Sequence, residues 1–425
     1  MKETLLHFVW QYLHFNIRNL FTESGDELQI IRQGNYQHDA GPDFENCQVV
    51  IDGIKLVGNI EIHVKSSDWM LHKHHQNPAF DTVILHVVWD HDREIVNSKG
   101  NQIPVLVLKG RVKPDLFTRY EKLINGKSDI LCSDEIVDLP KIRKFELIDK
   151  AVSSRLQQKS SVILNRLETN QGDWEETAYQ TLLQYFGFKV NNDSFLSLAQ
   201  KLPYKVIKKH LDQPEQVEAL LFGVAGFLRE DGDQHMLALY QEYNFLAKKY
   251  QLSGKELSPQ QWRFLRLRPA NFPTVRIAQL VSLLTSVNNL FSFLIDDQPL
   301  NEKRGRFRQQ QPEYWRHHYH FGKRYLNKTT KTIGKQSVES LLINVVTPIM
   351  AAYSRYLNQE IYMNRAIDLL ESLQPENNKI TRQWEDLGFV NGSAFDSQGL
   401  IMHYNEFCLE KRCLRCIAGT HIIKG

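Results

Sequence analysis

Apolar and polar residues alternate in short runs through the first part of the chain, as is typical of β-strands. The run Val57 to Lys65 shows this most clearly, because every second residue of it is apolar or glycine. Asp52-Gly53, just before it, predicts a hairpin turn. We expect an amphipathic helix over residues 3–15, followed by strands over residues 28–32, 47–51, 54–65, 83–89 and 103–108.

Beyond about residue 136 the apolar residues recur every three or four positions, which predicts helices. Trp174, Ala178 and Leu182 follow this spacing. A charged loop is expected over 296–336. The helices are expected at 141–168, 173–186, 194–201, 214–229, 235–250, 258–266, 276–295, 337–357, 360–373 and 393–410.

Length and composition fit a folded protein with more than one domain. The chain has 425 residues, of which 42% are hydrophobic and 24% charged. The change of pattern predicts an α/β domain with a mixed sheet over 1–135 and a mostly helical domain over 136–425, so the expected fold class is α+β. The net charge of +3 is too small to argue for nucleic-acid binding by itself.

The sequence shows neither the features of a signal peptide nor those of a membrane span. Its N-terminal segment carries Glu3 and His7 and lacks an uninterrupted apolar region. The longest apolar run, over residues 341–353, is interrupted by Asn344 and Pro348 and is too short to cross a bilayer. We therefore expect a cytoplasmic protein that makes no membrane contact.

Glu61, His63 and Lys65 share one face of the alternating run, opposite the apolar face. Residues two apart on a strand face lie about 7 Å apart at their Cα atoms. The Glu61 carboxylate and the His63 imidazole can therefore reach one metal ion or one water. A polar strand face is also commonly just solvated, and that interpretation stays open.

More histidines and carboxylates gather around this face. Four histidines lie between residues 61 and 75, and neutral imidazole is the commonest metal ligand. A divalent ion activates water and polarises a phosphoryl oxygen at once. His86, in the middle of an apolar strand, is expected to be a hydrogen-bonded core histidine or an outer partner of a ligand. The candidate metal ligands are Asp43, Glu61, His63, His72, His74 and Asp81.

Two segments of the second part combine basic and aromatic residues. Such interleaving suits phosphate neutralisation together with base stacking. The alternative is that these arginines pair with acidic neighbours and pack by their stems. The candidate nucleic-acid-binding residues are Arg263, Arg266, Arg268, Arg304, Arg306, Arg308, Trp315, Arg316, Tyr319, Lys323 and Arg324.

Three of the five cysteines lie in the last eighteen residues. Cys408, Cys413 and Cys416 have the spacing C-x4-C-x2-C, which suits zinc or an iron–sulfur cluster. A straight helix would place Cys408 and Cys413 about 140° apart, so the helix must end between them. Cys132 or His421 would supply a fourth ligand. Small buried thiols without a metal are the alternative.

Several longer motifs resemble a bacterial family catalogued as domain of unknown function 2851. They include GPDF (41–44), GNIEIHVKSSDW (58–69), VILHVVW (83–89), RLRPANFPTVRIAQL (266–280) and CLEKRCLRCIAG (408–419). The chain is identified as a member of this family over essentially its full length. The family has no established activity, so the resemblance implies no reaction.

The first region also resembles the PD-(D/E)XK nuclease core, in Pro42-Asp43 and in Glu61-Ile62-His63. This resemblance implies that two carboxylates hold magnesium and that a lysine orients the attacking water. Here His63 replaces the lysine, and Lys65 lies two residues further on the same face. Because magnesium prefers oxygen ligands, histidine makes manganese or zinc the better expectation. In some nucleases of this kind, a distant cysteine and a C-terminal group of cysteines bind one iron–sulfur cluster. Cys132 together with Cys408, Cys413 and Cys416 resembles this arrangement.

Together these features predict a metal-dependent phosphodiesterase acting on nucleic acid. Asp43 and Glu61 would hold the ion, and His63, helped by Lys65, would orient or deprotonate the water. One alternative is an inactive nuclease-like scaffold that binds nucleic acid or protein. Another is a zinc hydrolase of small substrates that uses Glu61, His63, His72 and His74.

Overall fold

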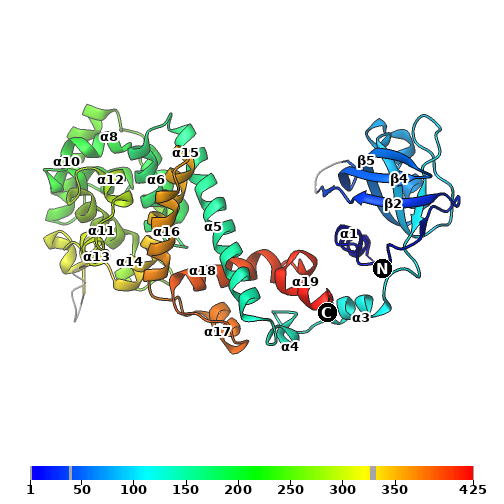
Figure 1. Cartoon of the computed structure of the whole chain (residues 1–425). Coiled ribbons are helices and arrows are strands. Elements are labelled where there is room, and N and C mark those ends of the chain that lie inside the picture. Colours follow the sequence, from blue (N-terminus) through cyan, green and yellow to red (C-terminus); the bar gives the residue numbers. More distant parts are fainter. Residues whose placement is uncertain (1, 38–40, 326–331, 425) are drawn as a thin grey trace. The chain divides into compact units, whose positions relative to one another are not determined.

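The chain forms two compact units in the computed structural model, which describes residues 2–37, 41–325 and 332–424 (Figure 1). The first, here called the sheet unit, consists of Met1–Glu146 together with Tyr404–Gly425. The second, the helical unit, is Leu147–His403. A mixed sheet in one unit and helices in the other make the fold α+β, as predicted. The expected boundary near residue 135 lies at Glu146, and the C-terminal residues belong to the sheet unit.

The sheet unit is built on seven strands in the order β1-β2-β4-β5-β6-β7, with β3 also paired to β4. Pairs from β1 to β5 are antiparallel, whereas β5, β6 and β7 are parallel to one another. Asp52 and Gly53 both have positive φ, as the tight turn between β4 and β5 requires. The strands are β1 (Leu20–Phe21), β2 (Glu27–Arg32), β3 (Asn35–Tyr36), β4 (Phe44–Ile51), β5 (Ile54–Lys65), β6 (Val83–Asp90) and β7 (Val105–Val107).

Strand β5 is the centre of this sheet, and residues 60–63 are buried on both of its faces. Helix α1 (Glu3–Gln11) contacts β5. A second layer follows β5 in sequence, formed by α2 (Asp68–Leu71) and the short 3-10 turns His74–Gln76 and Pro78–Phe80. Trp69 and Phe80 from this layer pack into one apolar cluster with Val88. The polar face of β5 is therefore covered at Glu61 and His63 and exposed at both ends of the strand.

The C-terminal segment completes the sheet unit. It contains a π-helical turn (Tyr404–Cys408), a 3-10 turn (Cys413–Arg415) and α19 (Ile417–Lys424). Helix α19 packs on α3 (Pro114–Ile124) and α4 (Ser133–Ile136). Residues far apart in sequence are thus brought together around Cys132, which precedes α4.

The helical unit has a core of apolar helices. Helix α11 is buried on all sides, and Pro273 begins it at a position where the missing N–H costs nothing. The helices are α5 (Lys141–Thr169, which starts in the sheet unit), α6 (Trp174–Phe186), α7 (Asn192–Lys201), α8 (Tyr204–Ile207), α9 (Pro214–Val224), α10 (Gln234–Tyr250), α11 (Pro273–Thr285), α12 (Leu290–Ile295), α13 (Leu300–Phe307), α14 (Lys335–Leu341), α15 (Thr347–Leu357), α16 (Glu360–Ser372), α17 (Lys379–Asp386) and α18 (Ala394–His403).

Three expectations for this unit were wrong. The segment 276–295 is not one helix, because α11 ends at Thr285 and α12 begins at Leu290. The segment 258–266 is not a helix, because only Pro259–Gln261 forms a short 3-10 turn and the indole N–H of Trp262 donates to the Ala225 carbonyl. Arg266 has φ 63°, which ends helical geometry there. The expected loop 296–336 contains helix α13, and its residues 326–331 lie outside the described part.

Helices α14 and α15 belong to one helical stretch, Lys335–Leu357. Within the described chain, this stretch is the one that is long and apolar enough to cross a membrane. In its apolar window, 72% of the residues are buried inside the protein. This burial is what a core helix of the helical unit requires, so its apolar character follows from packing. The predicted cytoplasmic location remains an expectation.

Two helical glycines offer a matched test of packing in the helical unit. In Gly223→Ala the new Cβ would lie 2.1 Å from the ring of Tyr243, a buried residue of α10. We expect the free energy of unfolding to fall by about 1–3 kcal/mol, as for other overpacked cores. In Gly305→Ala the new Cβ meets no atom within 4 Å, so stability should rise by about 0.5–1 kcal/mol. Urea unfolding measures both, and a Gly223→Ala variant as stable as Gly305→Ala would contradict this packing.

Candidate metal centre

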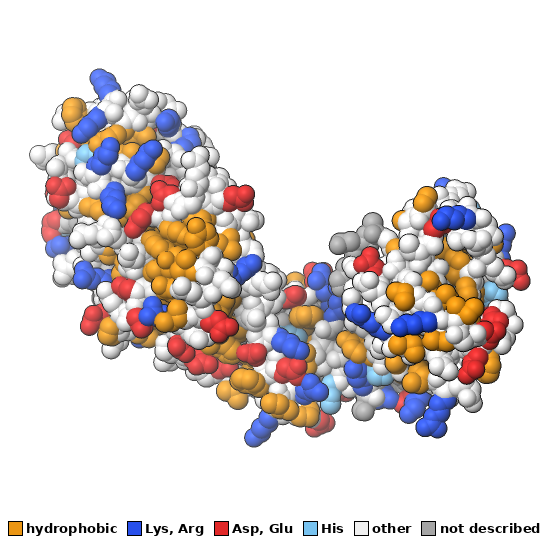
Figure 2. Space-filling view, turned by 45° about the horizontal axis from the view of Figure 1, so that its top comes forward, with side chains coloured by type: hydrophobic (Ala, Val, Ile, Leu, Met, Phe, Trp, Pro, Cys, Tyr) orange, Lys and Arg blue, Asp and Glu red, His pale blue; other side chains and the backbone are white. Residues whose placement is uncertain are grey.

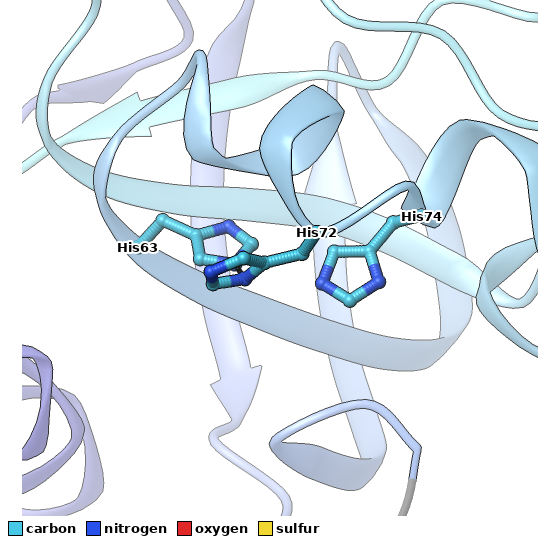
Figure 3. A group of neighbouring side chains, drawn as sticks. All are labelled: His63, His72 and His74. Atoms are coloured by element: carbon cyan, nitrogen blue, oxygen red, sulfur yellow. Dashed lines mark hydrogen bonds between the residues drawn. The ribbon is translucent and has the colours of Figure 1, made fainter.

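Strand β5 and the turn that follows it bring three imidazoles together. The Nε2 atom of His63 lies 3.0 Å from Nδ1 of His72. The rings of His63 and His74 stack, with centroids 5.3 Å apart. Lys73 adopts a left-handed conformation with φ 61° between the other two histidines and turns the chain back over the strand. One ring nitrogen from each histidine lies within 4.8 Å of the other two (Figure 3).

Glu61 joins the same cluster from the same face of β5. Its Oε1 atom lies 3.2 Å from Nε2 of His74 and 3.6 Å from Nε2 of His63. The side chains of Glu61 and His63 are only 6% and 1% exposed. The alternative of a solvated polar face is therefore wrong for these two residues.

Asp43, just before β4, lies beside Glu61. Its backbone N–H donates to Glu61 Oε2 at 3.1 Å, and its own Oδ2 accepts from the N–H of Ile62 at 2.9 Å. The two carboxylates are close enough for the charge of Asp43 to act on Glu61. Asp43, Glu61 and His63 thus belong to one continuous polar cluster.

His86 supports the cluster from the neighbouring strand. The parallel register places it directly opposite Glu61, and its Nε2 lies 2.8 Å from Nδ1 of His63. Both ring nitrogens of His63 therefore have a histidine neighbour. His86 is fully buried and holds the ring of His63 in place, so it is the hydrogen-bonded core histidine that its strand position predicts.

Two residues of α1 belong to the cluster and were missed in the sequence. His7 is buried, with its Nε2 3.3 Å from Asp43 Oδ2 and 3.8 Å from Glu3 Oε1. Its Nδ1 lies 2.9 Å from the hydroxyl of Tyr36. Glu3 and His7 are four residues apart, and this spacing on an otherwise apolar helix was the available signal.

The environment favours the neutral forms of these groups. Burial, and then the charge of Asp43, raises the pKa of Glu61 to about 9. Burial, and then the neighbouring imidazoles, lowers the pKa of His63 to about 2. Burial also lowers the pKa of His86, to about 3, and that of His74. Without a cation, Glu61 is therefore protonated at pH 7 and these three imidazoles are neutral.

Two of the candidate residues lie apart from the cluster. Lys65 is exposed at the end of β5, where its backbone N–H donates to Asp68 Oδ2. Asp81 organises a turn, because its carboxylate accepts from both the N–H and the hydroxyl of Ser98. The carboxylate of Asp81 is thus used in the local backbone structure.

The basic and aromatic residues divide into buried and exposed groups. Trp315 is fully buried, and its indole N–H donates to Glu218 at 2.7 Å. Arg304 and Arg316 pair with Glu339 and Glu313, as the alternative interpretation expects. Tyr319 is half-buried. On the face drawn in Figure 2, basic and acidic side chains are interspersed. The candidates with exposed side chains are Arg263, Arg266, Arg268, Arg306, Arg308, Lys323 and Arg324.

The four candidate cysteines come together within the sheet unit. Lys411 has φ 55° and turns the chain between Cys408 and Cys413, so the helix ends where the spacing requires. Burial, followed by the nearby Cys416 and Cys413, raises the pKa of the Cys132 thiol. Burial, followed by Cys416, Cys132 and Cys413, raises that of Cys408. Each thiol thus lies within electrostatic range of the others.

Cys416 also accepts an N–H donor. The backbone N–H of Gly419 lies 3.5 Å from its Sγ. A Cβ at Gly419 would lie 2.1 Å from the Cys413 carbonyl oxygen, so only glycine allows this close turn. The remaining cysteine, Cys47, is buried elsewhere and donates to the Gln33 carbonyl.

The metal-free wild type should lose stability as the pH rises, and the Glu61→Gln variant should not show this loss. The pKa of Glu61 is raised on folding from 4.5 to about 9, so unfolding releases a proton between these values. The contribution of Glu61 to the free energy of unfolding is full below pH 4.5. It is lost as the pH rises towards 9, by up to about 1.4 kcal/mol per pH unit. Between pH 7 and 8.5, urea unfolding in chelator should show this slope for the wild type and not for Glu61→Gln. The exposed Glu27→Gln is the control, and equal slopes for wild type and Glu61→Gln would contradict the burial of the carboxyl.

Comparison with known proteins identifies a family but no function. A family model described as "Protein of unknown function (DUF2851)" matches residues 3–379. This match includes Asp43, the histidine cluster and Cys132, and ends before the other three cysteines. No curated protein and no solved structure matches the chain significantly. The chain therefore belongs to the family of unknown function DUF2851.

Proposed function

We propose that this protein is a metal-dependent hydrolase that cleaves phosphodiester bonds in nucleic acid. The observation that supports this most is the convergence of Glu61 with His63, His72 and His74 in one cluster beside Asp43. Mixed nitrogen and oxygen ligands favour zinc or manganese over magnesium. When bound, such an ion lowers the pKa of a water ligand and polarises a phosphoryl oxygen.

The chemistry of the donor set fits a cation. The Nε2 atom of His74 is buried, lacks a hydrogen-bond partner in the described structure and lies 3.2 Å from Glu61 Oε1. A neutral imidazole offers a lone pair to a metal, and a protonated Glu61 can exchange its proton for an ion. Glu61 Oε1 and the facing nitrogens of His63, His72 and His74 would hold the ion, with Asp43 beside them.

His63 fits the role of a ligand better than that of a base. Its Nδ1 faces His86 and its Nε2 faces His72 and Glu61. A base needs a free nitrogen directed at the water, whereas a ligand needs its second nitrogen held by a partner. His86 supplies that partner, so His63 would bind through Nε2.

His7 and Asp43 are the better candidates for taking a proton from the water. The Nε2 atom of His7 is buried, lacks a hydrogen-bond partner in the described structure and lies 3.3 Å from Asp43 Oδ2. The hydroxyl of Tyr36 contacts the other ring nitrogen and fixes the ring. A proton received by His7 would be stabilised by Asp43 and by Glu3.

The exposed arginines and lysine of the helical unit would contact the phosphates of the substrate. Seven basic candidates have exposed side chains, whereas Arg304 is held by Glu339 and Trp315 is buried. Phosphate contact therefore fits this segment better than stacking by Trp315. Binding through phosphates is independent of sequence and weakens with salt.

A second candidate function is binding of nucleic acid without cleavage. It is favoured by His63, which occupies the lysine position of the nuclease motif and has both ring nitrogens engaged. Tight binding without turnover, unchanged in Asp43→Ala, would identify such a scaffold.

We also propose that Cys132, Cys408, Cys413 and Cys416 hold zinc or an iron–sulfur cluster. Four thiols within electrostatic range of one another, two buried and two half-buried, suit thiophilic metals, since the metal cation offsets the mutual repulsion of the thiolates. The N–H donated by Gly419 to Cys416 is a typical partner of such a thiolate. In this arrangement the metal would fasten the C-terminal segment to α4.

Loss of Glu61 or His63 should abolish hydrolysis. With manganese or zinc, the wild type is expected to cleave DNA, RNA or bis(p-nitrophenyl) phosphate, and Glu61→Gln and His63→Ala should reduce the rate by more than about 100-fold. Asp81→Asn changes a nearby carboxylate outside the cluster and should keep full activity. The hydrolase proposal fails if the folded wild type cleaves none of these substrates with any of the ions, or if Glu61→Gln cleaves them equally well.

The cysteine centre can be measured apart from the histidine cluster. In a His63→Ala background, anaerobically purified protein should contain zinc, or iron with sulfide, and Cys416→Ser should lose this metal and unfold at lower temperature. Cys47→Ser removes a buried thiol elsewhere and should retain the metal. Elemental analysis that finds no such metal in the parent, or equal amounts in Cys416→Ser, would rule out the centre.

A further inference from the structure

Arg276 of α11 is a buried cation surrounded by neutral groups. Its side chain is 5% exposed. Its Nη1 donates to Gln279 Oε1 at 2.9 Å, and its Nη2 donates to Asn271 Oδ1 at 2.8 Å and to Ser337 Oγ at 3.0 Å. No carboxylate of the described residues forms an ion pair with it. Its charge is therefore left without a counter-ion in the interior, which is strongly unfavourable.

Other buried cations of the helical unit do have acidic neighbours. Lys303 lies 3.0 Å from the carboxylate of Asp296. Arg155 is close enough to Glu376 to feel its charge. For Arg276, burial alone lowers the pKa to about 10, with no opposing effect from a carboxylate. Among the buried lysines and arginines of the described helical unit, Arg276 thus lacks the acidic neighbour that Lys303 and Arg155 have.

Arg276 lines a cavity of about 300 Å³ between the end of α6, the start of α11 and α14. Asn271 and Ser337, two of its hydrogen-bond partners, line the cavity as well. Phe186 and Phe188 also line the cavity and form part of an apolar wall. The cavity therefore combines one positive charge and small polar groups with aromatic surface, as small-molecule sites do.

The local backbone is arranged around the guanidinium. Phe188 has φ 48°, a left-handed conformation that non-glycine residues rarely adopt. Its ring centroid lies 4.3 Å from the guanidinium carbon of Arg276, so one face of the cation is covered. The Nε–H is buried and has no acceptor in the described structure.

We propose that this cavity binds a small organic anion whose phosphate or carboxylate group pairs with Arg276. The oxyanion would supply the missing negative charge beside the guanidinium, and the apolar part of the ligand would pack on the phenylalanines. Guanidinium is suited to both kinds of oxyanion. This site goes beyond the proposed hydrolase, because every residue that forms it belongs to the helical unit and none to the histidine cluster.

Asn271→Asp is the sharpest test, since it places a carboxylate 2.8 Å from Nη2 with almost no change in shape. The new charge would pair with Arg276 from within the protein and compete with the ligand. Calorimetry and thermal unfolding of the full chain would use sodium phosphate, sodium acetate, a nucleoside 5′-monophosphate and the matching nucleoside, at constant ionic strength with chloride as reference.

For the wild type, we expect binding and a raised unfolding temperature with at least one oxyanion and none with the nucleoside. A response to phosphate or the monophosphate assigns a phosphate ligand, and a response to acetate alone assigns a carboxylate. Asn271→Asp should weaken binding at least tenfold. Arg276→Met gives the same test if the aspartate variant does not fold, and the exposed Arg382→Met, which has no part in either proposed site, should bind normally.

Three results would overturn the proposal. One is a wild type that binds none of the oxyanions. The second is binding by both Asn271→Asp and Arg276→Met that is as tight as binding by the wild type. The third is an equal loss in Arg382→Met, which would indicate general attraction to surface charge instead of binding in the cavity.

Discussion

The sheet unit depends on burying a carboxyl group and several imidazoles together in its interior. Glu61 and His63 lie in the central strand, where both faces are covered. Ionised groups are unfavourable in such surroundings unless opposite charges meet. The structure resolves this by shifting Glu61 towards its protonated form and the histidines towards their neutral forms. The proposed cation would be shared by these same groups, so the electrostatic constraint and the proposed chemistry would have one origin.

The periodicity of the sequence predicted much of this unit. The limits of β5 follow from alternation and from the turn at Asp52-Gly53, and the common face of Glu61 and His63 follows from the period of two. The contribution of His7 could not be predicted in the same way. It depends on how α1 contacts β5, which is a tertiary contact between segments more than forty residues apart, and local pattern carries no information about it. The burial of Glu61 could not be predicted from the pattern either, since a polar face of a strand normally indicates exposure to solvent.

The basic and aromatic segments show where composition misleads. Local sequence cannot distinguish Trp315, which is buried against Phe222 and bonded to Glu218, from an exposed stacking residue. It cannot distinguish Arg304, paired with Glu339, from the exposed Arg306 two residues later. Arg276 is the reverse case. It follows a run of exposed arginines and resembles them in sequence, yet it alone lies in the interior beside a cavity, because α11 is buried on every side.

The composition of the sheet unit from two separate stretches of chain has a consequence for biosynthesis. The helical unit interrupts it, so roughly 250 residues are translated between the sheet and the segment that carries three of the four cysteines. A ribosome-bound chain can complete the helical unit while the sheet still lacks its last helix. The sheet unit is therefore begun before the helical unit and completed after it, because its last segment is made only when the helical unit has been translated.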